Sequence, residues 1–409
     1  MASIRKRILP SGETRWLVDY RDRAGGRRAK QFRSKAEAVS YETKVRAAIA
    51  HGTHVPDSQS VTVGKAADLW VAAGERDRLE ATTVRQRRQH VDLHIKPLIG
   101  MVKLSELTAP AVQAFANDLL GSRSRPMARR IVTSLKGVIS EAQRSGLVGQ
   151  NVALIARVGR GRAEREEEDR VVIPPKDHLK LMLRKSADLW PLTRKDTRDK
   201  LVTCCWRPLI VTAIFTGMRA SELRGLAWPS VDFETATIQV RQRADRYNRL
   251  GPPKSKAGRR TIPMAPIVAN TLREWKLACP TSKLDLVFPS ERREILWHTN
   301  LYQQCFIALL EACELMAKPS QSEGESAART IPDTEQEEEA AGIVPPYNFH
   351  ALRHAAASLF IEHGWTPKKV QSIMGHSSIQ VTFDIYGHLY SDPADDAKAM
   401  AQIEARLLA

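Results

Sequence analysis

The strongest constraint on the fold is the spacing of apolar residues, which recur every three or four positions over long stretches of the chain. Between residues 61 and 150 this spacing marks about four segments, which contain Val63, Ala67, Trp70 and Val71; Val84, Val91 and Ile95; Val112, Phe115 and Leu119; and Ile131, Leu135, Val138 and Ala142. Residues so spaced share one face of an α-helix. We therefore predict a bundle of about four helices. We expect Thr82 or Thr83 to cap the second helix, which should stop before Pro97.

Two shorter regions alternate apolar and polar residues, a pattern that is typical of half-buried strands. Trp16, Val18 and Tyr20 mark one strand, and a second is expected from Arg28 to Phe32. Ser34 is then predicted to cap a helix over residues 35–50. A further β-hairpin is expected between Ala236 and Met264. The fold class predicted for the chain is therefore mainly α with small β-sheets.

Changes in composition divide the chain into three predicted domains. A small β-sheet-plus-helix domain is expected over residues 1–55, a helical bundle over 61–155, and a larger, mostly helical domain with a β-hairpin over 171–409. The highly charged stretch 157–170 is predicted to be an exposed linker. Residues 318–342 carry seven acidic against two basic residues and are rich in Ser, Glu and Ala. We expect them to form a disordered acidic insertion.

The charge balance predicts a polyanionic partner. The chain holds 63 Lys and Arg against 46 Asp and Glu, a formal net charge of +17. Residues 1–50 alone hold thirteen basic and five acidic residues. Nucleic acid is the expected partner, and the N-terminal sheet is predicted to bind a DNA groove, although a solvated basic face would have the same composition.

Other residue types argue against several classes of protein. The five cysteines are odd in number and none lies in a CxxC pair, which favours neither a disulfide framework nor a zinc knuckle. The sequence has no stretch of about 20 apolar residues, so no transmembrane helix is expected. The basic N-terminus is not followed by the apolar core of a secretory signal, so we expect a cytoplasmic protein.

Three segments of the last predicted domain stand out. They are Thr216-Gly-Met-Arg-Ala-Ser-Glu-Leu; His350-Ala-Leu-Arg-His; and Met374-Gly-His-Ser-Ser, which is followed by Tyr386-Gly-His. The order of an arginine, a hairpin lysine, HxxR, GH and a tyrosine resembles that of the tyrosine recombinase (phage integrase) family. The resemblance covers about residues 205–390, and the three-domain plan is similar to that family as well.

The resemblance implies an N-terminal arm-type DNA-binding domain, a helical core-binding (SAM-like) domain and a catalytic domain. It implies site-specific recombination, the integration and excision of a bacterial phage or mobile element, through a 3′-phosphotyrosine intermediate. Neither cofactor, metal nor ATP is expected. The implied partners are double-stranded DNA attachment sites and three further copies of the chain in a homotetramer on DNA. A host DNA-bending factor and an excisionase are the expected accessory proteins, and a nucleoid-associated location is expected.

The residue types suit this chemistry. Arg219 and Arg353 are predicted to clamp the phosphate, because guanidinium is planar, always charged and bidentate. His350 lies three positions before Arg353, on the same helical face, and is expected to act as a base or hydrogen-bond donor. His376 is predicted to hydrogen-bond another phosphate oxygen. Tyr386 is the predicted nucleophile; a free tyrosine has a pKa of about 10, and nearby cations are expected to favour its phenolate.

Some assignments remain open. The resemblance assigns protonation of the leaving oxygen to a hairpin lysine, which we predict to be Lys254; Lys256, expected on the same strand face, is the alternative. Glu222 is either a carboxylate that orients Arg219 or a plain helix charge. His354 and His388 are expected to be structural or peripheral.

Two other classes of function compete with recombination. A non-catalytic sequence-specific DNA-binding protein would explain the charge but not the complete set of catalytic residue types. A metal-dependent nuclease would need a carboxylate cluster near the basic motifs, whereas the acidic residues gather in the linker and the insertion. At the C-terminus, Met400, Ile403 and Leu407 form an apolar stripe, which either docks on a neighbouring subunit or folds back on its own domain.

Overall fold

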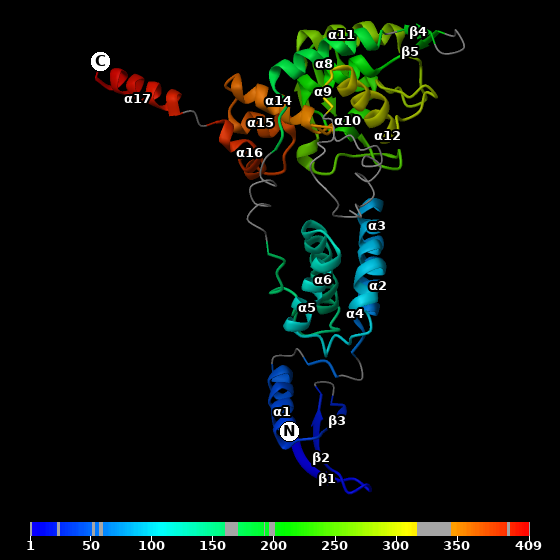
Figure 1. Cartoon of the computed structure of the whole chain (residues 1–409), viewed down its shortest axis with the longest axis vertical. Coiled ribbons are helices and arrows are strands. Elements are labelled where there is room, and N and C mark those ends of the chain that lie inside the picture. Colours follow the sequence, from blue (N-terminus) through cyan, green and yellow to red (C-terminus); the bar gives the residue numbers. More distant parts are fainter. Residues whose placement is uncertain are drawn as a thin grey trace, which may run out of the picture. The chain divides into compact units, whose positions relative to one another are not determined.

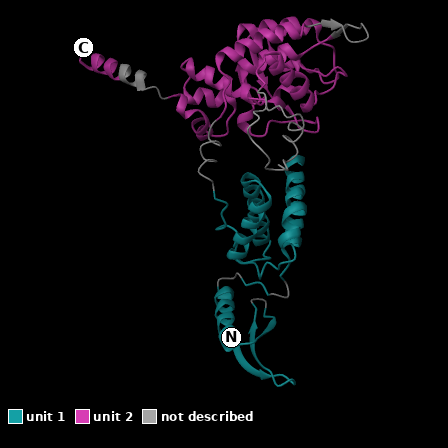
Figure 2. Ribbon diagram, viewed as in Figure 1, with its two compact units in different colours: residues 1–161, 327–330 teal, residues 162–326, 331–409 magenta. Residues whose placement is uncertain are grey.

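The computed structural model describes residues 2–22, 25–50, 54–56, 60–159, 171–191, 193–195, 201–316, 345–390 and 393–408. The predicted acidic insertion at 318–342 and most of the predicted linker at 157–170 lie outside these residues. The chain divides into two compact units close to residue 161 (Figure 2). Helices predominate, and the sheets are small and antiparallel (Figure 1), which confirms the predicted fold class.

The first unit begins with a three-stranded sheet in the order β1-β2-β3, formed by β1 (Ser3–Ile8), β2 (Thr14–Arg21) and β3 (Arg27–Phe32). Alternation in β2 turns Val18 and Tyr20 inward, where they pack with residues of α1 (Lys35–Ala50). The hydroxyl of Ser34 accepts a hydrogen bond from the backbone N–H of Glu37 at 3.2 Å, as expected of a cap. The two predicted strands are confirmed, and β1 was not predicted.

The remainder of the first unit is a helical bundle whose core contains the predicted apolar stripes. Its elements are α2 (Val63–Arg76), α3 (Ala81–His90), η1 (Val91–Ile95), α4 (Lys96–Ile99), α5 (Ala109–Ser122) and α6 (Arg125–Arg144). Two predictions about the second helix are wrong. It starts earlier than expected, at the cap residue Glu80, whose carbonyl accepts a hydrogen bond from Val84 at 3.0 Å. It also continues past Pro97, because the wider π-helical turn of η1 precedes the proline.

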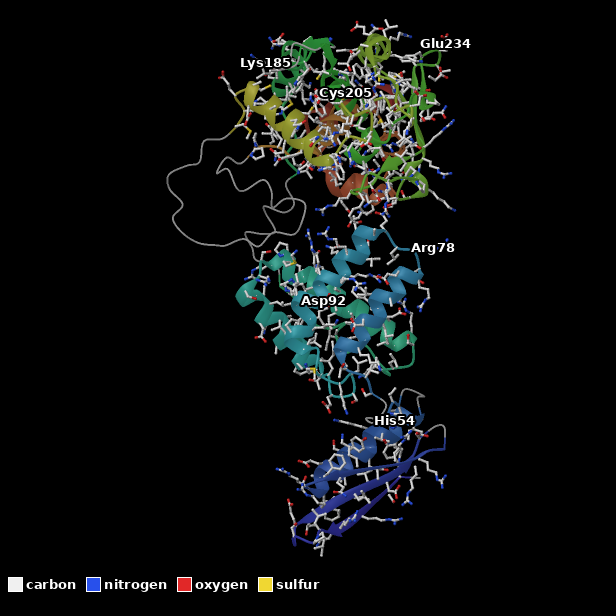
Figure 3. The ribbon with its side chains drawn as sticks, turned by 90° about the vertical axis from the view of Figure 1, so that its right-hand side faces the viewer. His54, Arg78, Asp92, Lys185, Cys205 and Glu234 are labelled. Carbon is white, nitrogen blue, oxygen red and sulfur yellow. The ribbon has the colours of Figure 1, made fainter. Side chains whose placement is uncertain are left out.

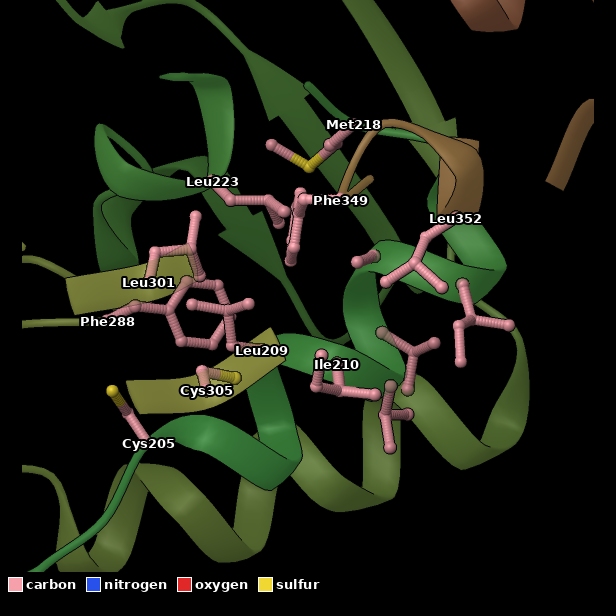
Figure 4. Packing of buried hydrophobic residues seen from close by; sticks show 14 of the residues in the cluster. Cys205, Leu209, Ile210, Met218, Leu223, Phe288, Leu301, Cys305, Phe349 and Leu352 are labelled. Atoms are coloured by element: carbon pink, nitrogen blue, oxygen red, sulfur yellow. The ribbon is translucent and has the colours of Figure 1, made fainter. Parts of the chain in front are cut away.

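The second unit is built around α9 (Trp206–Thr216), which is buried along most of its length. It packs against α8 (Lys176–Leu189), α11 (Pro266–Ala278) and α14 (Ala351–Glu362). Figure 4 shows side chains of this core, among them Leu209 from α9 with Phe288 and Phe349 from later segments. In Figure 3, Cys205 lies inside this unit, whereas Glu234 is exposed at its edge.

A second small sheet has the order β10-β7-β6, and β7 (Thr237–Val240) pairs antiparallel with β10 (Arg260–Pro263). The predicted hairpin is therefore confirmed. Its long connection contains η3 (Lys256–Gly258), where Gly258 donates to the carbonyl of Ser255 at 3.0 Å. The expectation that Lys254 and Lys256 share a strand face is wrong, because this tight turn occupies the segment before β10 begins.

The other elements of the second unit follow in chain order. They are the short pair β4 (Thr193–Lys195) and β5 (Leu201–Thr203), then α10 (Ala220–Arg224), η2 (Trp228–Ser230), β6 (Val231–Asp232), β8 (Arg243–Ala244), β9 (Leu250–Gly251), α12 (His298–Asn300), η4 (Leu301–Ile307), α13 (Ala308–Ala312), α15 (Pro367–Met374), α16 (Ile379–Tyr386), η6 (Gly387–Leu389) and α17 (Pro393–Leu408). Among the described residues, no helix has the length and apolar character needed to span a membrane.

Candidate active site

Arg219 stands at the start of α10 because α9 ends at Gly217, whose φ of +61° turns the chain sharply. The Arg219 Nη1 donates to Glu222 Oε1 at 2.8 Å, and its backbone N–H donates to Oε2 at 2.9 Å. The arginine side chain keeps 36% of its surface exposed, whereas Glu222 keeps 2%. Glu222 is thus the carboxylate that orients Arg219, the first of the two predicted alternatives.

Arg260, the first residue of β10, is a site residue that the sequence reasoning missed. Its Nη1 and Nη2 donate to the two oxygens of Glu222 at 3.1 and 2.9 Å, and its Nε donates to the carbonyl of Ile373. Burial raises the pKa of the Glu222 carboxyl, but Arg260 and Arg219 outweigh this and lower it to about 2. The strand alternation that places Arg260 on the same face as the buried Ile262 was the available signal.

Arg353, on α14, joins two other segments of the site. Its Nη1 donates to the carbonyl of Gly217 at 2.6 Å and its Nη2 to the carbonyl of Met374 at 2.5 Å. Only 3% of the residue is exposed. Burial, followed by the charges of Arg219 and Arg260, lowers its pKa to about 9. Arg353 therefore remains a cation at neutral pH.

His376 is positioned by the end of α15, where Gly375 adopts a φ of +66°. The His376 Nδ1 lies 2.9 Å from the hydroxyl of Thr382, and Arg219 Nη2 donates to the carbonyl of Gly375 at 3.3 Å. Burial and the charge of Arg353 lower the pKa of His376 to about 3, so its imidazole is neutral at pH 7.

His350 precedes α14, and its ring meets that of His354 edge to face at 4.8 Å between centroids. The residue is exposed, yet desolvation by the surrounding groups, followed by the charges of His354 and Arg353, lowers its pKa to about 3. His350 and Arg353 belong to the same helical turn, as the spacing predicted.

Tyr386 ends α16, and none of its surface is exposed. It packs in a small cluster with Val370 and Met374, and its ring lies 6.3 Å from that of His376 with an interplanar angle of 16°. Burial raises the pKa of the phenol to about 12, although Arg353 and Arg219 lower it in part. The two arginines favour the phenolate, as expected, but burial outweighs them and the net pKa is raised.

The Tyr386 hydroxyl lies 2.8 Å from Nδ1 of His354. We expected His354 to be structural or peripheral, but it contacts the predicted nucleophile directly. The structure thus gathers Arg219, His350, Arg353, His376 and Tyr386 from α10, α14, α15 and α16. Lys254 lies on an exposed bend of the hairpin connection, and the hairpin reaches the site through Arg260.

Comparisons with known proteins match this architecture. The model of the Phage integrase family matches residues 192–392, and that of the Phage integrase N-terminal SAM-like domain matches residues 62–120. The chain belongs to the tyrosine recombinase (phage integrase) family. The match to the catalytic part of the family includes all the residues gathered at the site.

The relatives include a prophage integrase and a XerC-like tyrosine recombinase. Prophage integrase IntR of Escherichia coli K12 is 31% identical over 196 residues, 48% of this chain and 45% of that protein. The chain thus spans less than half the length of that relative. A XerC-like tyrosine recombinase of Caldanaerobacter subterraneus subsp. tengcongensis is 25% identical over 383 residues, 90% of each chain.

Solved structures of the family share the fold. The Tn1549 transposon integrase in complex with a circular intermediate DNA has a TM-score of 0.61 at 20% identity, over 86% of this chain and all of that one. A lambda integrase tetramer bound to a Holliday junction has a TM-score of 0.53 at 18% identity, over 91% of this chain and 95% of that one.

Proposed function

We propose that this tyrosine recombinase catalyses site-specific DNA recombination, integrating and excising a bacterial phage or mobile element. The observation that carries the proposal is the convergence of two arginines, two histidines and a tyrosine from four separate elements onto one site. Arg353 contacts the carbonyls of Gly217 and Met374, and Arg219 contacts that of Gly375. These bonds join the two arginines to the end of α9 and to the segment that carries His376.

Each residue has a role in a balanced strand transfer. The Tyr386 Oη attacks the scissile phosphorus and loses its proton, while the P–O5′ bond breaks. This leaves a 3′-phosphotyrosine and a free 5′-hydroxyl, whose proton comes from Lys254, with Lys256 as the alternative donor. Arg219 and Arg353 stabilise the charge that develops on the phosphate oxygens, and His350 and His376 donate further hydrogen bonds to them. Rejoining reverses these steps without ATP, because the phosphotyrosine retains the bond energy.

Burial of Tyr386 places a condition on this reaction. Its side chain has no exposed surface, whereas Arg219 and His350 are open to solvent. A phosphate can therefore reach Arg219 and His350 first, and the buried Arg353 and Tyr386 must become accessible to it before the reaction.

The proposed DNA contacts extend to the N-terminal sheet, which we assign to a second, arm-type site. One face of the sheet packs on α1, and the strand register places five arginines on the opposite face: Arg5, Arg7, Arg15, Arg21 and Arg27. Arg27 also pairs with Asp19. A twisted three-stranded sheet with such a face fits a DNA groove, and its guanidinium groups fit the phosphates that border the groove.

Recombination between two duplexes requires four strand cleavages, and we propose a homotetramer on DNA. On α17, Met400, Ile403 and Leu407 are exposed by 65, 56 and 82%. This exposure favours docking on a neighbouring subunit over folding back. A host DNA-bending factor and an excisionase are the accessory partners that such a reaction would use.

Exchange between two labelled duplexes tests the proposed function. The duplexes carry the sequences that flank the element encoding the chain, and the reaction contains EDTA and no ATP. Recombinant-length products are expected. Binding without exchange would favour a non-catalytic DNA-binding protein, and products that appear only with Mg²⁺ would favour a metal-dependent nuclease.

A further inference from the structure

We propose that His354 is a catalytic residue, the group that accepts the proton of Tyr386 when its hydroxyl attacks the phosphate. The inference rests on the proposed recombinase function and adds a residue to it. In this assignment His350, the histidine of the HxxR motif, remains a hydrogen-bond donor to the phosphate.

The geometry places His354 at the reacting atom. Its Nδ1 lies 2.8 Å from the Tyr386 hydroxyl, within the range of a hydrogen bond that transfers a proton. The two rings are 5.8 Å apart between centroids. The His350 ring lies 4.8 Å from that of His354, and His350 is exposed to solvent.

The helix that carries His354 also carries the phosphate clamp. Arg353 and His354 are consecutive residues of α14, and the two terminal guanidinium nitrogens of Arg353, Nη1 and Nη2, donate to carbonyls of two other segments. A phosphate held by Arg353 and a hydroxyl held by His354 are therefore positioned by one rigid element. Placing both groups on one helix favours the reaction, because even a small displacement of the nucleophile from the phosphorus lowers the rate strongly.

A neutral imidazole has a ring nitrogen free to accept a proton, and a phosphate anion beside it would increase its basicity. Burial, with the neighbouring charge of Arg353, lowers the pKa of His354 to about 4, so its imidazole is neutral at pH 7. When Nδ1 accepts from the hydroxyl, the ring proton is on Nε2. During attack the Tyr386 O–H bond breaks, the O–P bond forms and the proton moves to Nδ1. The resulting imidazolium is stabilised by the phosphate charge, and it returns the proton to Tyr386 when the strands rejoin.

The titratable and charged groups around His354 should allow it to accept a proton only when DNA is bound. Arg353 on its own helix, His350 before that helix and Tyr386 on α16 face it. A second positive charge beside Arg353 is unfavourable until an anion occupies the site. The phenol should therefore keep its proton until DNA is bound, which limits unproductive attack.

The test compares rates of covalent adduct formation in single-turnover reactions on a nicked duplex with the flanking sequence of the element. The variants are His354→Gln, which keeps a hydrogen-bond acceptor of lower basicity, and His363→Gln as the matched control. His363 lies just beyond the end of α14, exposed, with its Nδ1 near the carbonyl of Leu359. We expect His354→Gln to slow adduct formation by about 100-fold or more, a typical contribution of general base catalysis. DNA affinity should stay unchanged, and His363→Gln should match the wild type.

A second comparison separates proton acceptance from positioning. Tyr386 is replaced by 3,5-difluorotyrosine in the wild type and in His354→Gln. Because the fluorinated phenol is more acidic, it needs less help from a base, and the defect of His354→Gln should shrink by at least tenfold.

The outcomes are distinct. An undiminished defect with the fluorinated tyrosine would overturn proton acceptance and leave a positioning role. An unchanged or faster rate in His354→Gln would also overturn the inference, because His354 would then be dispensable or would restrain the tyrosine. If the wild type bound the duplex but formed no adduct, the proposed function itself would fail.

Discussion

Glu222 accepts hydrogen bonds from Arg260 at 3.1 and 2.9 Å, and the two side chains are only 2 and 4% exposed. The same carboxylate holds Arg219. The pair therefore links the hairpin that carries Lys254 to Arg219, the proposed phosphate clamp.

Replacing one residue of the Glu222–Arg260 pair should reduce the stability of the fold more than replacing both. Arg260→Met leaves the buried Glu222 with only the more exposed Arg219 to balance its charge, which should cost up to about 3–5 kcal/mol of stability. The double variant Arg260→Met with Glu222→Leu should recover part of that loss, because an apolar pair tolerates burial. Chemical denaturation midpoints measure both effects. Purely additive losses would show that the two residues are not coupled.

Gly375 and Gly364 form a matched pair for testing how closely the site is packed. Both have positive φ, +66° and +74°. A Cβ at Gly375 would lie 2.9 Å from the carbonyl oxygen of Ala257 and 3.0 Å from the Cδ of Arg260, whereas a Cβ at Gly364 would meet nothing within 4 Å. We expect Gly375→Ala to reduce DNA cleavage at least tenfold and Gly364→Ala to retain near-normal activity. Equal losses of DNA cleavage in the two variants would mean that backbone strain, and not the close packing around Gly375, causes the loss.

Stability should fall below pH 6.5 in part through His376. Its folded-state pKa is about 3, and an unfolded histidine has a pKa of about 6.5. As the pH falls through this window, only the unfolded state gains the proton, so the free energy of unfolding decreases, by about 2 kcal/mol at pH 5. Denaturation midpoints at pH 7 and pH 5 should therefore differ less in His376→Gln than in the wild type. An equal difference would argue against a buried neutral imidazole.

The salt dependence of DNA binding tests which face of the N-terminal sheet meets the DNA. Arg5 and Arg7 lie on the open face, whereas Lys30 lies on the face that packs against α1, with its ammonium 4.8 Å from the Tyr41 ring centroid. Replacing Arg5 and Arg7 with Gln should reduce the slope of log K against log salt by about 1 for each lost phosphate contact. Lys30→Gln should leave the slope unchanged. Similar changes in the two variants would contradict this orientation.

The sequence revealed those parts of the fold and site whose signals are local. The apolar spacing of Ile131, Leu135 and Val138 depends only on helix geometry, and Glu222 lies within one turn of the Arg219 it orients. The hairpin was predicted because the alternation of β7 and β10 is visible within each strand.

The features that sequence reasoning missed depend on distant contacts. Arg260 finds its partner 38 positions away, and the hydroxyl partner of Tyr386 is 32 positions away. The raised pKa of Tyr386 follows from its complete burial, which no local pattern reveals. The early start of α3 was missed because its cap residue Glu80 makes no side-chain capping bond, so the preferred cap residues Thr82 and Thr83 were misleading.

Covalent trapping tests the central claim most directly. A nicked duplex with the element's flanking sequence is incubated in EDTA with the wild type and with Tyr386→Phe, which keeps the buried ring but removes the nucleophilic oxygen. We predict a denaturation-resistant protein–DNA adduct with the wild type and none with Tyr386→Phe. An adduct that persists in Tyr386→Phe would assign the nucleophile to another residue, and tight binding of both proteins without any adduct would contradict the recombinase account.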